Sequence, residues 1–171
     1  MKKIALPLIL LIIFFGLIPF NTLGRSTKTQ KPLQVGYSIG INKISKETMK
    51  YSKSVGLDYI EVSVSELVDK YRFFHLSDEE ITEKMKSVKS AADEAGIKIW
   101  SIHMPFGQYI DLSLSDEKER QQVVAMHRKV LHFCRILEPE IILLHPSFYL
   151  GLNEREARKK QLIRSAIELN K

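Results

Sequence analysis

Residues 97–111 read IKIWSIHMPFGQYID and mark a point where a strand gives way to a loop. Strand periodicity over the first seven residues predicts two faces, with Ile97, Ile99, Ser101 and His103 on one and Lys98, Trp100 and Ile102 on the other. On this pattern Trp100 packs under a helix. Met104 and Pro105 then break the pattern, so His103 occupies the last position of the strand.

Residues 141–147 repeat this arrangement further along the chain as IILLHPS. An apolar strand ends at His145, and Pro146 restricts the backbone of that histidine to the extended region. If the two strands are neighbours in a parallel sheet, both imidazoles lie at the same edge. The sequence therefore predicts a functional site where these strands end.

The rest of the chain alternates short apolar strands with amphipathic helices. Two further strands are expected at residues 33–38 and 59–63, the second with Tyr59, Glu61 and Ser63 on one face. Helices are expected over residues 45–55, from a capping box at 77–80 to Ala95, from Ser115 to Leu137, and from Asn153 onward. Such alternation predicts a parallel sheet built from right-handed crossover units.

Four strand–helix units fit either a small open sheet or part of an eight-stranded barrel, which typically needs about 250 residues. Nothing after the first strand resembles a glycine-rich phosphate loop, so a nucleotide-binding open sheet has no support. Functional groups at the C-terminal ends of successive strands are typical of a barrel rim. We predict an α/β fold with about four of the eight (β/α) units of a TIM barrel, that is, a half-barrel or truncated barrel.

The N-terminus has the layout of a secretory signal. Lys2 and Lys3 precede an apolar run over residues 4–20, and Thr22-Leu23-Gly24 supply the residues before a cleavage site. We predict a signal peptide over residues 1–24, a flexible leader over 25–32 and the barrel domain over 33–171. The expected location is periplasmic or extracellular. The alternative is an uncleaved membrane anchor, because the run reaches the roughly 17-residue minimum for a membrane span.

Charge and cysteine content exclude several classes of protein. The formal net charge is +6, and loss of residues 1–24 removes two lysines and no acids, which leaves +4. A balance this mildly basic does not predict a nucleic-acid partner. Cys134 is the single cysteine, so neither an intrachain disulfide nor a cysteine-based zinc site can form, and its apolar helical context predicts a buried hydrophobic residue.

Glu61, His103 and His145 are the candidate site residues, each at or near the C-terminal end of a predicted strand. Two neutral imidazoles can share a divalent metal or bind a sugar hydroxyl or phosphate. A carboxylate beside them can complete the ligand set or act as a base. The alternative is that each histidine only caps its strand by hydrogen bonding to a loop carbonyl.

Other polar residues have plainer explanations. His75 is expected on the surface, His127 in the core and His132 on a helix surface. Asp111 could orient His103 or cap the following helix, and the cap is favoured. The last helix carries a run of cations that is typical of a solvated face, with phosphate binding as the alternative: Arg155, Arg158, Lys159, Lys160 and Arg164.

Several motifs together resemble the sugar phosphate isomerase/epimerase family. They are GLDYIE at 56–61, IHMP at 102–105, DLS at 111–113 leading into SDE at 115–117, and ILLHP at 142–146. That family has the xylose isomerase-like TIM barrel, which endonuclease-four-type nucleases share. The resemblance runs from Gln34 to about Leu169.

The resemblance implies metal-assisted proton transfer next to the carbonyl of a sugar or sugar phosphate. It assigns Glu61 a catalytic role, and His103, His145 and Glu61 the binding of substrate or of a divalent ion (Mn, Mg or Zn). Glu138-Pro139 departs from the glycine turn usual in the family. The family's main carboxylate ligands come from strands five to eight, so this chain alone is expected to lack the catalytic second half.

Two other functions remain open at this point. One is a non-catalytic exported carbohydrate-binding fragment, and the other is a metal-dependent nuclease of the endonuclease-four type. Membrane contact is expected only through the N-terminal segment. A half-barrel has two unpaired strand edges, so a homodimer that covers them is also predicted.

Overall fold

The computed structural model describes residues 33–147 and 154–171. Residues Leu33–Lys171 form one unit of the structure. The predicted signal peptide and leader, residues 1–32, lie outside the described residues, so both stay predictions. Among the helices that are described, none is long and apolar enough to cross a membrane.

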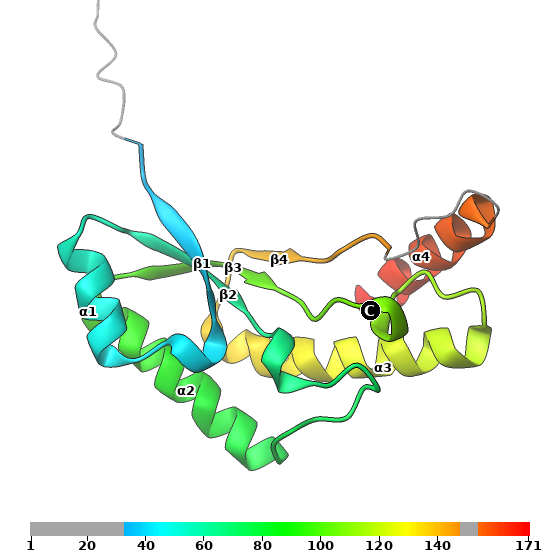
Figure 1. Ribbon diagram of the computed structural model, residues 1–171, viewed down its shortest axis with the longest axis horizontal. Coiled ribbons are helices and arrows are strands. Elements are labelled where there is room, and N and C mark those ends of the chain that lie inside the picture. Colours follow the sequence, from blue (N-terminus) through cyan, green and yellow to red (C-terminus); the bar gives the residue numbers. More distant parts are fainter. Residues whose placement is uncertain (1–32, 148–153) are drawn as a thin grey trace, which may run out of the picture. The chain divides into compact units, whose positions relative to one another are not determined.

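Four parallel strands form one sheet in the order β1-β2-β3-β4, which confirms the α/β fold and the sequential parallel pairing (Figure 1). The strands are β1 (Gly36–Gly40), β2 (Tyr59–Ser63), β3 (Lys98–His103) and β4 (Ile141–Leu143). The helices are α1 (Lys46–Ser54), α2 (Asp78–Ala95), α3 (Glu117–Cys134) and α4 (Arg155–Leu169). Short 3₁₀ turns η1 to η4 span Ile41–Lys43, Ser65–Leu67, Gln108–Ile110 and Arg135–Leu137.

Local signals fix the ends of the first two helices. Ser45 and Ser77 each accept a hydrogen bond from the backbone of the third helical residue, and each belongs to a reciprocal capping box. Gly96 ends α2 in the left-handed conformation at φ 67°, which costs glycine little. In the turn before β4, Glu138 takes the same left-handed conformation at φ 50°. Glycine adopts this conformation most easily, so the turn has the backbone geometry of a glycine turn although its residue is glutamate.

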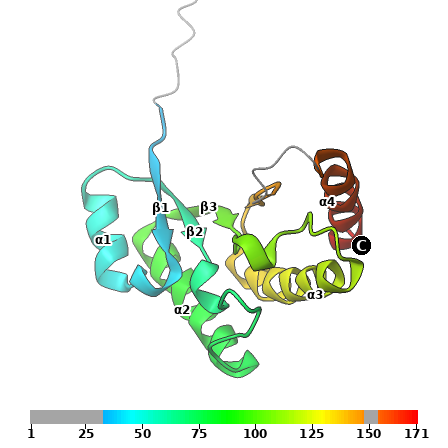
Figure 2. The same ribbon diagram turned by 45° about the vertical axis from the view of Figure 1, so that its right-hand side comes forward.

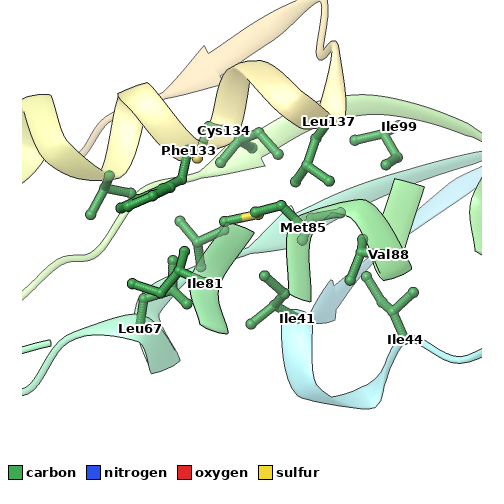
Figure 3. Packing of buried hydrophobic residues seen from close by; sticks show 14 of the residues in the cluster. Ile41, Ile44, Leu67, Ile81, Met85, Val88, Ile99, Phe133, Cys134 and Leu137 are labelled. Atoms are coloured by element: carbon green, nitrogen blue, oxygen red, sulfur yellow. The ribbon is translucent and has the colours of Figure 1, made fainter. Parts of the chain in front are cut away.

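One face of the sheet is buried under helices (Figure 1). On β2 the side chains of Ile60 and Val62 are at most 1% exposed, whereas Tyr59, Glu61 and Ser63 on the other face are partly exposed. This confirms the predicted division of that strand. Figure 3 shows Ile41, Met85 and Phe133, from η1, α2 and α3, in the same apolar cluster. We call the helix-covered side the outer face of the sheet and the opposite side the inner face.

A bulge in β3 makes the predicted faces of that strand partly wrong. Ile60 pairs with Ile99, but the next residue, Glu61, pairs with Ser101, so Trp100 is an extra residue. The extra residue shifts the alternation by one. Ile99 therefore lies on the outer face and packs in the core beside Leu137 (Figure 3). Trp100 is 46% exposed rather than packed under a helix.

Three predicted boundaries also shift. The first strand lies at Gly36–Gly40 instead of residues 33–38, because Leu33 and Val35 are exposed and pairing with β2 begins at Gly36. Asp116, not Ser115, caps α3 by accepting a hydrogen bond from the backbone of Glu119. The ladder of β4 ends at Leu143, before His145. The predicted cap Asn153 falls outside the described residues.

A buried arginine joins α3 to α4, which lie side by side (Figures 1 and 2). The side chain of Arg120 is fully buried; it donates to Glu117 and Glu168 at 2.8 Å and to Ser165 at 2.9 Å. A buried guanidinium needs such partners because its charge is costly to remove from water. The predicted amphipathic helix and its buried His127 and Cys134 are confirmed. Its buried face comprises side chains that are each at most 1% exposed: Val123, His127, Val130, Cys134 and Leu137.

Candidate functional site

Glu61 from the middle of β2, His103 at the end of β3 and His145 just beyond β4 meet in one chain of contacts. The Nε2 atom of His103 lies 2.7 Å from the Nε2 atom of His145. On the other side of the same ring, Nδ1 of His103 lies 3.2 Å from Oε1 of Glu61. The structure thus brings together all three residues that the sequence selected, and the histidines contact side chains rather than acting only as strand caps.

The carboxylate of Glu61 determines which nitrogen of His103 carries a proton. Burial raises the pKa of Glu61, but hydrogen bonds from Ser101 and Ser38 and the nearby His103 outweigh burial and hold that pKa below its ordinary value. Glu61 is therefore ionised at neutral pH and can only accept hydrogen bonds. A neutral His103 then carries its proton on Nδ1 and presents an unprotonated Nε2 toward His145.

His145 completes the contact as the donor. With Nε2 of His103 unprotonated, the 2.7 Å contact requires that Nε2 of His145 carries the hydrogen. The His145 ring also stacks on Phe106, with ring centroids 3.8 Å apart. Phe106 lies in the segment after β3, so that segment contributes to the site as well as the strand itself.

The two facing nitrogens are compatible with a shared divalent ion. Imidazole nitrogens bind zinc at about 2.0–2.1 Å, and two ligands of one tetrahedral ion then lie more than about 3 Å apart. The rings at 2.7 Å must therefore separate slightly, and His145 must move its proton to Nδ1, before they share one ion. Glu61 contacts the opposite nitrogen of His103, where a carboxylate orients a metal-binding histidine. Within residues 33–147 and 154–171, no group of three or more His, Cys, Asp or Glu side chains is arranged to hold a metal. The described residues thus offer two neighbouring imidazoles and no third His, Cys, Asp or Glu placed with them as a metal ligand.

A cleft of about 590 Å³ extends from Glu61 across the inner face toward the N-terminal ends of the strands. Its lining includes Tyr59, Trp100 and Ser101. The bulge places Trp100 here rather than under a helix, where its sequence pattern predicts it. An aromatic side chain beside Glu61 and hydroxyl groups gives the cleft both apolar and polar walls, as ligand sites commonly have.

Asp111 has neither of its two predicted roles. Its buried carboxylate accepts hydrogen bonds from the backbone of Ser113 at 2.7 Å and from the hydroxyl of Ser147 at 3.1 Å, and it pairs with Arg158 at 3.4 Å. It therefore neither contacts His103 through these bonds nor caps α3, whose cap is Asp116. The prediction of a solvated surface is wrong for Arg158, whose side chain is 17% exposed.

The remaining histidines and the cysteine lie outside this chain of contacts. His75 and His132 are exposed, as predicted. His127 is buried and hydrogen bonds through Nδ1 to the Val123 carbonyl at 3.0 Å; burial lowers its pKa and keeps it neutral. Burial raises the pKa of the Cys134 thiol to about 12, so this residue is an unreactive part of the core.

Comparison with protein families gives a match over most of the chain. Residues 49–169 match the family model described as xylose isomerase-like TIM barrel. A search of the curated proteins found no match.

Solved structures with the same fold include several sugar-converting enzymes. A D-psicose 3-epimerase, solved in the presence of D-fructose, has a TM-score of 0.58 at 16% identity, over 81% of this chain and 49% of its own. The D-psicose 3-epimerase of Clostridium cellulolyticum H10, solved with D-tagatose, has a TM-score of 0.57 at 18% identity, over 80% and 47%. A xylose isomerase domain protein from Planctomyces limnophilus has a TM-score of 0.55 at 18% identity, over 81% and 50%. This chain therefore spans about half the length of these structures, and identities this low establish the fold alone.

Proposed function

The chain belongs to the xylose isomerase-like TIM-barrel family, and we propose that it binds a sugar or sugar phosphate and supplies the histidine part of an isomerase or epimerase site. One observation carries the proposal. The imidazoles of His103 and His145 face each other at 2.7 Å where β3 and β4 end, with Glu61 bound to the far side of His103. Catalytic residues of TIM barrels lie at that end of the strands.

Each residue has a distinct part in the proposed chemistry. Glu61 holds His103 in one tautomer and stabilises positive charge on its ring when a proton arrives. His103 and His145 bind substrate oxygens or a divalent ion (manganese, magnesium or zinc). When bound, such an ion would polarise the hydroxyl and carbonyl oxygens of the sugar and ease proton removal at the carbon between them.

The proton transfer itself needs a base next to the reacting carbon. Glu61 is the catalytic candidate from the sequence, and its ionised state suits a base. Its hydrogen bonds to Ser101 and His103, however, occupy both carboxylate oxygens. We therefore propose that Glu61 orients His103 and that further carboxylates complete the reaction. On this account, turnover by the described residues alone is slow.

Export and pairing of two chains are separate parts of the proposal. Residues 1–24 are proposed to direct the chain to the periplasm or outside the cell. A reporter fused to this segment should cross the inner membrane, and a reporter that stays in the cytoplasm would refute export. A homodimer is proposed to cover the open edges of β1 and β4.

The decisive experiment measures sugar binding and turnover together. A panel of ketoses and ketose phosphates is titrated with added manganese, magnesium or zinc, while turnover is followed by chromatography. We expect measurable binding and little turnover, and loss of binding in His103→Ala and His145→Ala but not in His132→Ala, an exposed control. Folded wild-type chain that binds none of these sugars would contradict the proposal. Rapid turnover that the two site variants abolish would instead show that further carboxylates are unnecessary.

A further inference from the structure

We propose that Asp111 is a positioning residue for His145, acting through Ser147. The inference rests on the role proposed for His145, but its test reads the imidazole directly and needs no substrate. The last residue of the β4 ladder is Leu143, so His145 lies two residues beyond regular pairing. Other contacts must then set the direction of its side chain.

Ser147 is fixed by a buried polar cluster two residues after His145. Its hydroxyl lies 2.7 Å from the hydroxyl of Ser113 and donates to Oδ2 of Asp111 at 3.1 Å. Only Pro146 separates the two residues, and proline restricts its own φ and the conformation of His145 before it. Fixing Ser147 therefore limits the directions that the His145 side chain can take.

Asp111 organises this cluster because one carboxylate accepts from several donors. Oδ1 accepts the backbone N–H of Ser113, while Oδ2 faces both Ser147 and Arg158. Arg158 also balances the charge of Asp111, whose side chain is only 1% exposed. An amide at this position would have one acceptor oxygen in place of two, so Asp111→Asn must lose at least one of these contacts.

The polar cluster and the contacts of the imidazole ring both constrain residues 145–147, the cluster at Ser147 and the ring contacts at His145. The segment after β3 contributes Phe106, which stacks on the His145 ring, and then Asp111 and Ser113, which hold Ser147. Arg158 brings α4 into the same cluster. With the ring held at one point and the backbone at another, His145 can keep its Nε2 atom directed at His103.

The test observes the His145 ring by ¹⁵N NMR of histidine side chains, assigned with His145→Ala. In the wild type we expect the Nε2–H tautomer of His145 and slow exchange of that proton with water. In Asp111→Asn and Ser147→Ala we expect roughly tenfold faster exchange, as the loss of one hydrogen bond would produce, and a mixture of tautomers. Ser147→Thr keeps a hydroxyl and should restore the wild-type signals.

Asp116→Ala is the matched control, because it removes the cap of α3 in the same connecting segment. It should lower the melting temperature and leave the His145 signals unchanged. Wild-type signals in folded Asp111→Asn and Ser147→Ala would overturn the proposal. So would an equal change in Asp116→Ala, since general destabilisation would then explain the effect. Failure of sugar binding would leave these signals unaffected, so the two proposals can fail separately.

Discussion

The outer and inner faces of the sheet use the same strands for different purposes. On the outer face, Ile60, Val62 and Ile102 are at most 1% exposed under the helices. On the inner face, Ile141 and Leu143 are each 43% exposed, and the polar residues of the candidate site lie at the C-terminal ends of the strands. Because side chains alternate along a strand, one set of positions can stabilise the fold while the other remains available for binding.

The largest expected difference between the faces is in stability. Ile102→Ala on the outer face should lower the free energy of unfolding by about 2–5 kcal/mol, because it leaves a cavity in a closed core. Ile141→Ala on the inner face should cost the monomer less than about 1 kcal/mol, because that side chain is in contact with water in the single chain. Urea denaturation of both variants, at a protein concentration below that of the proposed dimer, measures the difference. Equal losses would show that the inner face is covered within the monomer.

The polar contacts between α3 and α4 should have the next largest effect. Arg120→Ala removes a fully buried guanidinium with three partners and should cost about 3 kcal/mol. This is the low end for a buried pair, because Glu117 and Glu168 remain partly exposed and can be rehydrated. Arg155→Ala, an exposed change in α4, should stay within about 0.5 kcal/mol. A loss in Arg120→Ala no greater than this control would mean that α4 is not held by Arg120.

The same contacts predict a dependence on pH. The hydrogen bond from Arg120, with smaller help from Gln121, lowers the pKa of Glu117 from 4.5 to about 2. A lowered pKa in the folded state contributes stability above the unfolded value, and this contribution is lost as the pH falls from about 5 toward 2. The melting temperature should decline over that range, and less steeply in Glu117→Gln. Parallel curves for the two proteins would contradict this assignment.

Polar substitutions on the inner face should have the smallest effect on the free energy of unfolding. They should, however, change self-association. Ile141→Ser combined with Leu143→Ser removes apolar surface next to the edge of β4 that pairs with no other strand of the described residues. Sedimentation should show a dimer for the wild type and a monomer for the double variant. A monomeric wild type at the same concentration would contradict the proposed homodimer.

The features that the sequence predicts well are those with local causes. The capping box at Ser77, the end of α2 at Ala95 and the two faces of β2 each depend on a few adjacent residues. The meeting of His103 and His145 was predictable as well, because neighbouring parallel strands end at one edge of the sheet. In each case a short pattern and a general rule of chain geometry were sufficient.

The features that the sequence missed depend on distant partners. The bulge at Trp100 follows from the pairing of β3 with β2, which a single strand does not reveal. Asp111 contacts Ser147 and Arg158, which lie 36 and 47 residues later in the chain. Its place in the DLS motif, just before a predicted helix, favoured a helix cap instead. Buried polar clusters of this kind become visible only when the surrounding elements have been placed.

We propose that the inner face of the sheet, where β3 and β4 end, is a binding site centred on two facing imidazoles. Its most direct test is a titration with Zn²⁺, an ion that imidazole ligands suit, followed by isothermal titration calorimetry. We predict one bound ion per chain in the wild type, loss of binding in His103→Ala and in His145→Ala, and unchanged binding in His132→Ala. Equal Zn²⁺ binding by all four proteins, or none by the folded wild type, would contradict this account of the site.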